Sequence, residues 1–315
     1  MARDTAVAYR RSLEEAATAL TAACVRVQRD EPLARHTSFR IGGPADLFVE
    51  ALSVREVETV LQACVARPLP AFFLGGGTNL LVSDRGVRGL VLKLGKPFDF
   101  VEWELDDAGG ALRVGAAVPF KRLVMQAVAA GFAGLEFGEG IPGTIGGGLL
   151  MNAGAFGGEI GRVVTAIEAV DERGDPVVME REQLGFAYRR LTLPGRVVVT
   201  AVRLRLARGN PATLAATVAD AKVRRDRHQP KGHPNAGSVF KNPPGAHAGR
   251  LIEGAGLKGA RLGDAVFSER HANFIVNLGR ARAMDVKGLM DLATKVVWRR
   301  LGVALEAEVR LVGDW

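Results

Sequence analysis

Two glycine-rich stretches are the parts of this 315-residue chain that most clearly suggest chemistry. The first, GGGTN, covers residues 75–79 and follows an apolar segment that we expect to be a strand. The second, GIPGTIGG, covers residues 140–147 and carries no charge. Successive backbone N–H groups of such loops can bind phosphate oxygens without a long helix. Two such surfaces suggest a large flat ligand with a diphosphate, while tight turns between strands are the alternative interpretation of GGGTN.

Two familiar phosphate-binding motifs do not fit these stretches. A dinucleotide fingerprint of the Rossmann type requires a helix after the glycines, because the helix N-terminus holds the pyrophosphate. The residues that follow GGGTN, LLVSDRG, turn again within a few positions, so no full helix fits. A P-loop is also absent, because the Gly95-Lys96 pair is followed by proline and lacks the preceding spacing.

The uncharged run over residues 140–158 is about as long as a membrane-spanning helix. Eight of its nineteen residues are glycine, and each glycine costs about 1 kcal/mol in a helix relative to alanine. We therefore expect a buried loop system and no membrane partner. The first twenty residues have no apolar core typical of a signal peptide, so we expect a cytosolic, cytoplasmic protein.

The charge and cysteine content restrict the ligand class further. A net charge of +8 is typical of some nucleic-acid-binding proteins, but only residues 222–231 form a dense basic cluster. An anionic small molecule such as a nucleotide diphosphate fits this distribution better, so we expect no nucleic-acid partner. Cys24 and Cys64 lack metal-type spacing, and we interpret both as buried structural thiols in a reducing compartment, with no metal site.

The elements that must position these loops alternate irregularly between short strands and helices. Such mixing favours an α+β fold over a regular doubly wound sheet. We expect helices over 8–30, 54–66, 120–130 and 212–226, and a last helix capped by Asp285 and ending near Gly302. We expect strands over 46–50, 163–170, 176–179 and 196–206, one ending at Leu74, and one formed by the final ALEAEVRLVG. A polar break at residues 207–211 marks the best domain boundary.

The sequence closely resembles the bacterial UDP-N-acetylenolpyruvoylglucosamine reductases, the flavoenzymes that make UDP-N-acetylmuramate for peptidoglycan. The resemblance covers nearly the whole chain, in the order of motifs typical of the family. These motifs are HTSFRIGGPADLFVE, LGGGTNLLVSDRG, GLEFGEGIPGTIGGGLLMNAGAFGGEI, FAYRR, PNAGSVFKNP, AGRLIEGAGLKG, SERHANFIVN and LEAEVRLVG.

The resemblance implies an α+β fold in which a two-subdomain FAD-binding module of the PCMH type precedes an α+β substrate-binding domain. It implies subdomains over residues 1–92 and 93–207, with the FAD module over about 38–206, and a substrate domain over 208–315 that includes the C-terminal strand. It also implies non-covalent FAD, NADPH as hydride donor and a small nucleotide-sugar substrate. The implied FAD contacts are Gly75, Gly76, Gly77, Thr78, Asn79, Gly140, Ile141, Pro142, Gly143, Thr144, Gly146, Gly147, Gly154, Arg225 and Arg310.

The resemblance also implies three catalytic residues. Ser238 stands at the position of the family's proton donor, Arg189 at that of its active-site arginine, and Glu308 at that of its active-site carboxylate. Tyr188, Asn242 and His271 are the implied substrate contacts. The 49-residue separation of Arg189 and Ser238 resembles the shorter family subclass, which lacks an inserted substrate-covering loop. The residues after Arg189 depart from the family's usual Ser-Phe, which affects the expected local shape.

These residue types suit the reduction of an enol-ether double bond that is conjugated to a carboxylate. An arginine binds a carboxylate at two points and stabilises charge that develops on it. A serine held within hydrogen-bond reach can deliver a proton to carbon, and a glutamate can accept or donate a hydrogen bond. Without the resemblance, each would be interpreted as a surface, turn or strand residue, and for Arg225, Arg310 and His271 that alternative stays open. An oxidase on the same FAD scaffold and a basic nucleic-acid-binding protein are the competing functions.

Overall fold

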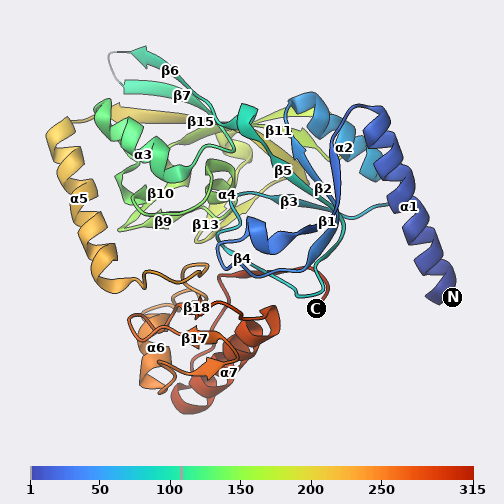
Figure 1. The fold of residues 1–315 in the computed structure, drawn as a ribbon. Coiled ribbons are helices and arrows are strands. Elements are labelled where there is room, and N and C mark those ends of the chain that lie inside the picture. The colour runs from blue at the N-terminus through green and yellow to red at the C-terminus, as the bar shows by residue number, and fades with distance from the viewer. Residues whose placement is uncertain (1, 107–108) are drawn as a thin grey trace. The chain divides into compact units, whose positions relative to one another are not determined.

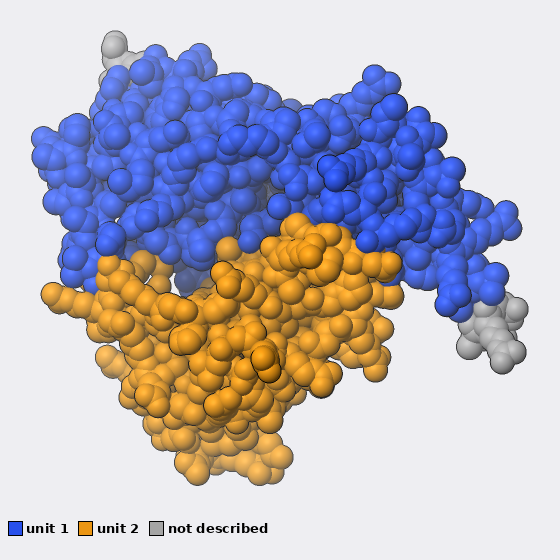
Figure 2. Space-filling view, viewed as in Figure 1, with its two compact units in different colours: residues 1–29, 46–76, 89–223 blue, residues 30–45, 77–88, 224–315 orange. Residues whose placement is uncertain are grey.

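The computed structural model describes residues 2–106 and 109–315. The chain forms two compact units, coloured separately in Figure 2. Unit 1 comprises Met1–Arg29, Asp46–Gly76 and Gly89–Val223, and unit 2 comprises Asp30–Ala45, Gly77–Arg88 and Arg224–Trp315. The α-helices are α1 (Ala2–Ala22), α2 (Val54–Ala66), α3 (Phe120–Ala129), α4 (Ile145–Leu150), α5 (Pro211–His228), α6 (Ala248–Gly254) and α7 (Ala283–Leu301).

A four-stranded sheet has the order β1-β2-β5-β3, in which β3 and β5 pair in parallel. The strands are β1 (Val27–Pro32), β2 (Pro44–Ala51), β5 (Val87–Leu94) and β3 (Ala71–Leu74). The helices α1 and α2 share a buried apolar core with this sheet, to which Leu20, Leu61 and Leu90 contribute (Figure 1). Ser53 begins α2, because its hydroxyl accepts a hydrogen bond from the Glu56 amide.

The larger sheet of unit 1 is antiparallel, with the order β12-β11-β15-β7-β6 and β8 paired to β15. Its strands are β6 (Val101–Asp106), β7 (Gly109–Gly115), β8 (Phe132–Ala133), β11 (Val164–Asp171), β12 (Pro176–Glu180) and β15 (Val197–Arg208). The helices α3 and α4 and the start of α5 bury their apolar side chains in a core with this sheet, among them Phe120, Leu149 and Leu214 (Figure 1).

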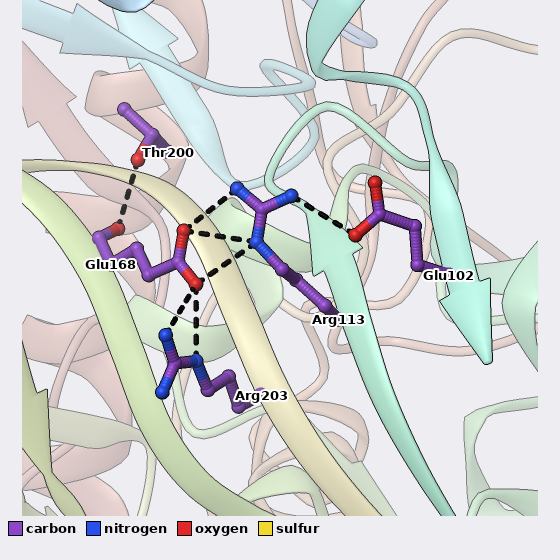
Figure 3. A network of polar contacts seen from close by, with 5 residues as sticks. All are labelled: Glu102, Arg113, Glu168, Thr200 and Arg203. Carbon is purple, nitrogen blue, oxygen red and sulfur yellow. Dashed lines mark hydrogen bonds and ion pairs between the residues drawn. The ribbon is translucent and has the colours of Figure 1, made fainter. Parts of the chain in front are cut away.

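The solvent-facing surface of this sheet carries a charged network (Figure 3). Glu168 on β11 accepts hydrogen bonds from Arg113 on β7, at 2.8 Å to Nη2, and from Arg203 on β15, at 3.0 Å to Nε. Arg113 also donates to Glu102 on β6 at 3.1 Å. The network therefore connects four strands across the sheet. The hydrogen bond from Arg113, and to a smaller extent that from Arg203, holds the pKa of Glu168 below its usual value.

Unit 2 is built from two early segments and the C-terminal part of the chain. It contains β4 (Leu80–Val82) paired in parallel with β19 (Arg310–Val312), and a three-stranded sheet of β16 (Arg261–Leu262), β17 (Ala265–Phe267) and β18 (Ile275–Asn277). Phe39, Ile41 and Leu81 are buried in one core with residues of α6, α7 and β17. Asp84 accepts hydrogen bonds from the first two amides of α7, at 2.8 and 3.1 Å.

Most predicted elements of regular periodicity are confirmed. The helix over 54–66 is present as α2, and Gly302 ends α7 in a left-handed conformation with φ 67°. The prediction of a helix up to residue 30 is wrong, because α1 ends at Ala22 and Cys24 adopts φ 61° before β1 begins. Asp285 is not the first residue of α7 but its third, where its carboxylate accepts from the Arg282 amide at 2.9 Å.

Three further expectations differ from the structure. The glycine block is not purely loop, since Ile145–Leu150 forms α4, and the final strand covers only Arg310–Val312. Of the two cysteines predicted to be buried, Cys64 is buried and Cys24 is exposed. Burial raises the pKa of the Cys64 thiol to about 11. Within the described part of the chain, every helix is too short or too polar to span a membrane.

Candidate active site

The two glycine stretches contact each other through bare backbone within unit 1. A Cβ atom on Gly76 would lie 2.7 Å from the Cα of Gly143, and one on Gly75 would lie 3.2 Å from the hydroxyl oxygen of Thr144. No side chain fits between the two loops at Gly76, because the neighbouring atom is backbone and cannot rotate away. Position 76 must therefore be glycine so that the two loops can pack against each other.

The structure of unit 2 likewise requires a glycine at position 77. Its φ is 62°, and a Cβ there would lie 1.9 Å from the carbonyl oxygen of His36. The Gly77 carbonyl accepts a hydrogen bond from the Ser38 amide at 3.0 Å. The strand β4 follows at Leu80, so the expected absence of a helix directly after GGGTN is confirmed.

The second glycine block forms α4 in spite of its glycines. Thr144 caps the helix, because its hydroxyl accepts from the Gly147 amide at 3.4 Å, and Ile145 and Leu149 are fully buried. A Cβ on Gly146 would lie 2.9 Å from the Cβ of Ala116, so this glycine packs on the protein itself. At Gly147, by contrast, a Cβ would meet only the Thr144 hydroxyl at 3.5 Å, so this side of α4 is open.

The remaining glycines of the block shape the surrounding turns. Gly140 and Gly143 adopt left-handed φ values of 70° and 97°, on either side of Ile141 and Pro142. Gly154 lies in β9 (Gly154–Ala155), which pairs with β10 (Gly158–Glu159), and a Cβ there would be 2.5 Å from the Gly158 carbonyl oxygen. Gly154 therefore packs on the protein itself, whereas Gly147 leaves open backbone. Open backbone of this kind can bind the phosphate oxygens of a cofactor such as FAD.

Arg189 lies at the tip of a tight hairpin in unit 1. The hairpin consists of β13 (Gly185–Ala187) and β14 (Arg190–Thr192), and Tyr188 and Arg189 are the two residues between its strands. Arg189 has φ 55°, and its guanidinium carbon lies 5.2 Å from the centre of the Tyr188 ring. The unusual residues after it are accommodated because Leu191 packs into the core of unit 1.

Ser238 and Glu308 lie on neighbouring segments of unit 2, although seventy residues separate them in the sequence. The Glu308 amide donates to the carbonyl of Val239 at 2.9 Å, and Phe240 forms an antiparallel bridge with Ala307. The Asn79 side chain donates to the Glu308 carbonyl at 2.9 Å, which ties the end of the GGGTN loop to this segment. Both Ser238 and Glu308 are half-buried. Two of the three predicted catalytic residues are thus brought together within one unit, and the third, Arg189, belongs to the other.

The predicted substrate contacts of unit 2 already take part in local hydrogen bonds. The Asn242 side-chain oxygen accepts from the Ala248 amide at 3.0 Å, at the start of α6. The Nδ1 atom of His271 accepts from the Asn273 amide at 3.2 Å, and its ring packs edge-to-face on Phe274. Burial, together with the nearby charge of His228, lowers the pKa of His271 below its usual value. His271 is therefore neutral near pH 7, with its proton on Nε2.

The two predicted phosphate contacts lie at the ends of elements in unit 2. Arg225 is in the last turn of α5, and Arg310 begins β19 with an exposed side chain. The Arg310 amide donates to the carbonyl of Asn79 at 3.0 Å, so the backbone of this arginine lies beside the end of the GGGTN loop. The described residues include no cluster of three or more His, Cys, Asp or Glu side chains able to hold a metal ion.

One residue that sequence reasoning did not select is Asn152. Its side chain is completely buried and donates to the carbonyl of Ala187, the last residue before the Tyr188–Arg189 turn, at 3.0 Å. The signal that could have revealed it is an amide within an otherwise uncharged and largely apolar run, since buried polar groups require partners.

Comparison with known proteins agrees with this geometry. Residues 45–180 match the family model of an FAD binding domain, and residues 229–312 match that of the UDP-N-acetylenolpyruvoylglucosamine reductase C-terminal domain. The chain is 49% identical to UDP-N-acetylenolpyruvoylglucosamine reductase 2 of Symbiobacterium thermophilum over 289 residues, which covers 91% of this chain and 92% of the relative. It is 47% identical to the reductase of Anaeromyxobacter sp. (strain Fw109-5), over 92% of this chain and 89% of the relative.

A solved structure gives the same result for the fold. The crystal structure of the reductase from Thermus caldophilus superposes with a TM-score of 0.78 at 39% identity, covering 91% of this chain and 99% of that one. These matches confirm the predicted α+β fold with an FAD-binding module followed by a reductase C-terminal domain, and they confirm FAD as the cofactor class. The chain therefore belongs to the UDP-N-acetylenolpyruvoylglucosamine reductase family of FAD-dependent oxidoreductases.

Proposed function

We propose that this protein reduces UDP-N-acetylglucosamine enolpyruvate to UDP-N-acetylmuramate, with NADPH as the hydride donor, and so supplies a peptidoglycan precursor. Family membership supports the reaction class, and the use of NADPH and a nucleotide sugar suits a cytoplasmic location. The observation that carries the proposal is the pairing of the Ser238 and Glu308 segments, because it provides a proton donor and a carboxyl group on adjacent backbone.

Ser238 supplies the proton in this proposal. FAD, when bound, would supply the hydride for the terminal carbon of the enolpyruvyl group, and the adjacent carbon would then need a proton. The Ser238 side chain is half-buried, and we assign the proton of its hydroxyl to the substrate carbon. A positioned general acid of this kind contributes about 10²- to 10⁴-fold to the rate.

Arg189 and Glu308 stabilise the charge that develops on the substrate carboxylate. The guanidinium group binds a carboxylate at two points and stays charged at any working pH. Its stabilisation grows as charge moves into the carboxylate, which is when catalysis requires it. Glu308 donates a hydrogen bond to the enolate oxygen if its carboxyl group is protonated in the site, or orients a neighbouring donor if it is ionised.

The other predicted contacts have roles that their hydrogen bonds define. The oxygen of the Asn242 amide is already used, so its NH₂ group is the part left to donate to the substrate. The Nε2–H of His271 is likewise the donor of that ring, because Nδ1 accepts a backbone amide. We assign Arg225 and Arg310 to phosphate groups of the cofactor, and Tyr188 to the substrate beside Arg189. The FAD contacts of the two glycine stretches belong to the same proposal.

The decisive experiment follows NADPH oxidation by the purified, yellow protein with and without UDP-N-acetylglucosamine enolpyruvate. We expect oxidation to depend on the substrate and to yield a product two hydrogen atoms heavier. Substrate-independent NADPH oxidation that consumes oxygen would indicate an oxidase on the same scaffold. A colourless protein that binds nucleic acid with a steep salt dependence would exclude a flavoenzyme.

A further inference from the structure

The side-chain amide of Asn152 joins three backbone segments of unit 1. Asn152 follows α4, and its Nδ2 donates to the Ala187 carbonyl at 3.0 Å while its Oδ1 accepts from the Gly161 amide at 3.1 Å. Ala187 pairs with Arg190 as the last pair of the hairpin before its two-residue turn. The amide therefore fixes the base of the turn that carries Arg189.

The packing around this amide is tight. A Cβ on Gly161 would lie 2.7 Å from the Phe186 ring and 3.0 Å from the Asn152 oxygen, so ring, amide and backbone are in close contact. Asn152 has 0% exposure and φ 40°, a conformation that asparagine tolerates better than most residues. Apolar packing gives no reason for an amide here, because a buried amide without partners is costly.

We propose that Asn152 is a positioning residue that holds the Arg189 guanidinium in place against the substrate carboxylate. This inference rests on the function proposed above. Arg189 itself adopts φ 55°, which is disfavoured for a residue other than glycine, and the hydrogen bond from Asn152 to Ala187 supports the turn from outside the hairpin. Two-point binding is sensitive to position, and a displacement of about 1 Å can slow a reaction about 10²-fold.

The test uses Asn152→Asp in the FAD-loaded protein. The substitution keeps the size and the acceptor for Gly161, but it places an oxygen against the Ala187 carbonyl in place of a donor. We expect unchanged FAD content and unchanged flavin reduction by NADPH, while flavin reoxidation by the enolpyruvyl substrate slows about 10-fold or more. Combined with Arg189→Lys, the same change should slow reoxidation less than about twofold further, because that geometry is already lost.

Two further variants keep the test decisive if Asn152→Asp folds poorly. Asn152→Gly accepts the left-handed backbone and introduces no charge, and we expect the same selective slowing. Asn210→Ala serves as the stability control, since it removes the side chain that accepts the Ala212 and Thr213 amides at the start of α5. It should lower the Tm and leave the ratio of the two half-reactions unchanged.

Equal slowing of both half-reactions, loss of FAD, or an undiminished effect in the Arg189→Lys background would show that Asn152 is merely structural. Hydrogen exchange separates this inference from the proposed function. If substrate fails to reoxidise even the unsubstituted protein, the function is rejected. Faster amide exchange over residues 184–193 in Asn152→Asp would still support the anchoring of the hairpin, and unchanged exchange would overturn it.

Discussion

At the scale of single residues, Ser238 separates chemistry from binding. In the proposed reaction, NADPH reduces the flavin and the enolpyruvyl substrate reoxidises it, and only the second step needs a proton at carbon. Ser238→Ala removes one oxygen from a half-buried side chain and barely changes its shape, so folding and FAD content should survive. In rapid mixing, flavin bleaching by NADPH should be normal, while reoxidation by substrate slows about 10²- to 10⁴-fold. Ser238→Cys should restore part of the rate, and equal slowing of both steps would assign the serine a structural role.

Substitution of Arg189 by lysine separates the effect of its positive charge from that of its two-point binding geometry. Arg189→Lys keeps the positive charge but loses two-point binding of the proposed substrate carboxylate and the contact of the guanidinium carbon with the Tyr188 ring, 5.2 Å from its centre. We expect reoxidation of the flavin by substrate to slow about 10²-fold, as for one lost electrostatic donor. The measurement is stopped-flow absorbance at saturating substrate, with reduction by NADPH as the internal control. An unchanged rate would remove Arg189 from the site.

At the scale of elements, α4 distinguishes glycines that serve the fold from those that leave room for a ligand. Gly147→Ala adds a methyl group on the open side of the helix, where the nearest atom is 3.5 Å away. Alanine favours a helix over glycine by about 1 kcal/mol, so the apoprotein should keep its Tm or gain. The methyl group would occupy the cofactor surface, and we expect FAD to bind about 10-fold more weakly, measured by flavin fluorescence.

Gly76→Ala is the matched counterpart. Its Cβ would lie 2.7 Å from the Gly143 Cα, so the apoprotein itself should lose about 1–3 kcal/mol of stability through overpacking. If both variants lowered apoprotein stability and left FAD affinity unchanged, Gly147 would not face the cofactor.

The ion network of the large sheet gives a prediction about pH. The pKa of Glu168 is lowered in the folded state, chiefly by the hydrogen bond from Arg113, so its contribution to stability is present above the unfolded value of 4.5. That contribution is lost as the pH falls through the lowered folded pKa. Glu168→Gln should therefore cost about 1 kcal/mol of unfolding free energy at pH 7, a modest value because both arginines are partly exposed. The difference should shrink under acidic conditions, and Glu104→Gln, at an exposed position of β6, should cost less at pH 7 than Glu168→Gln.

The elements also show what the sequence could specify. The amphipathic pattern of 54–66 and the glycine after α7 determine local structure, and both predictions hold. The end of α1 depends on Cys24 adopting a left-handed conformation, for which no residue type in that segment gives a signal. The pairing of β4 with β19 joins segments more than 200 residues apart, and only the folded chain specifies it. The proposed catalytic residues come from the family motifs, whereas the burial of Asn152 is visible only in the structure.

At the scale of the whole molecule, unit 2 contains more of the chain than the substrate domain predicted for residues 208–315. Unit 2 also takes in Asp30–Ala45 and Gly77–Arg88, from the first third of the chain. Phe39, Ile41 and Leu81 from these segments are 0–3% exposed within the core of unit 2. The early segments also supply β4, which pairs with β19, and Asp84, which caps α7.

We therefore expect the isolated fragment 208–315 not to fold. Each of these three apolar side chains contributes about 1.5–3 kcal/mol by burial, and together they approach the whole stability of a small domain, about 5–15 kcal/mol. Without them the fragment keeps α6 and α7 but loses one side of its core. Two-dimensional NMR of the fragment should show poorly dispersed amide signals, whereas the full chain melts cooperatively. Phe39→Ala in the full chain provides the graded control, with an expected loss of about 3–5 kcal/mol. A dispersed spectrum from the fragment would mean that residues 208–315 form an autonomous domain and that the early segments only cover it.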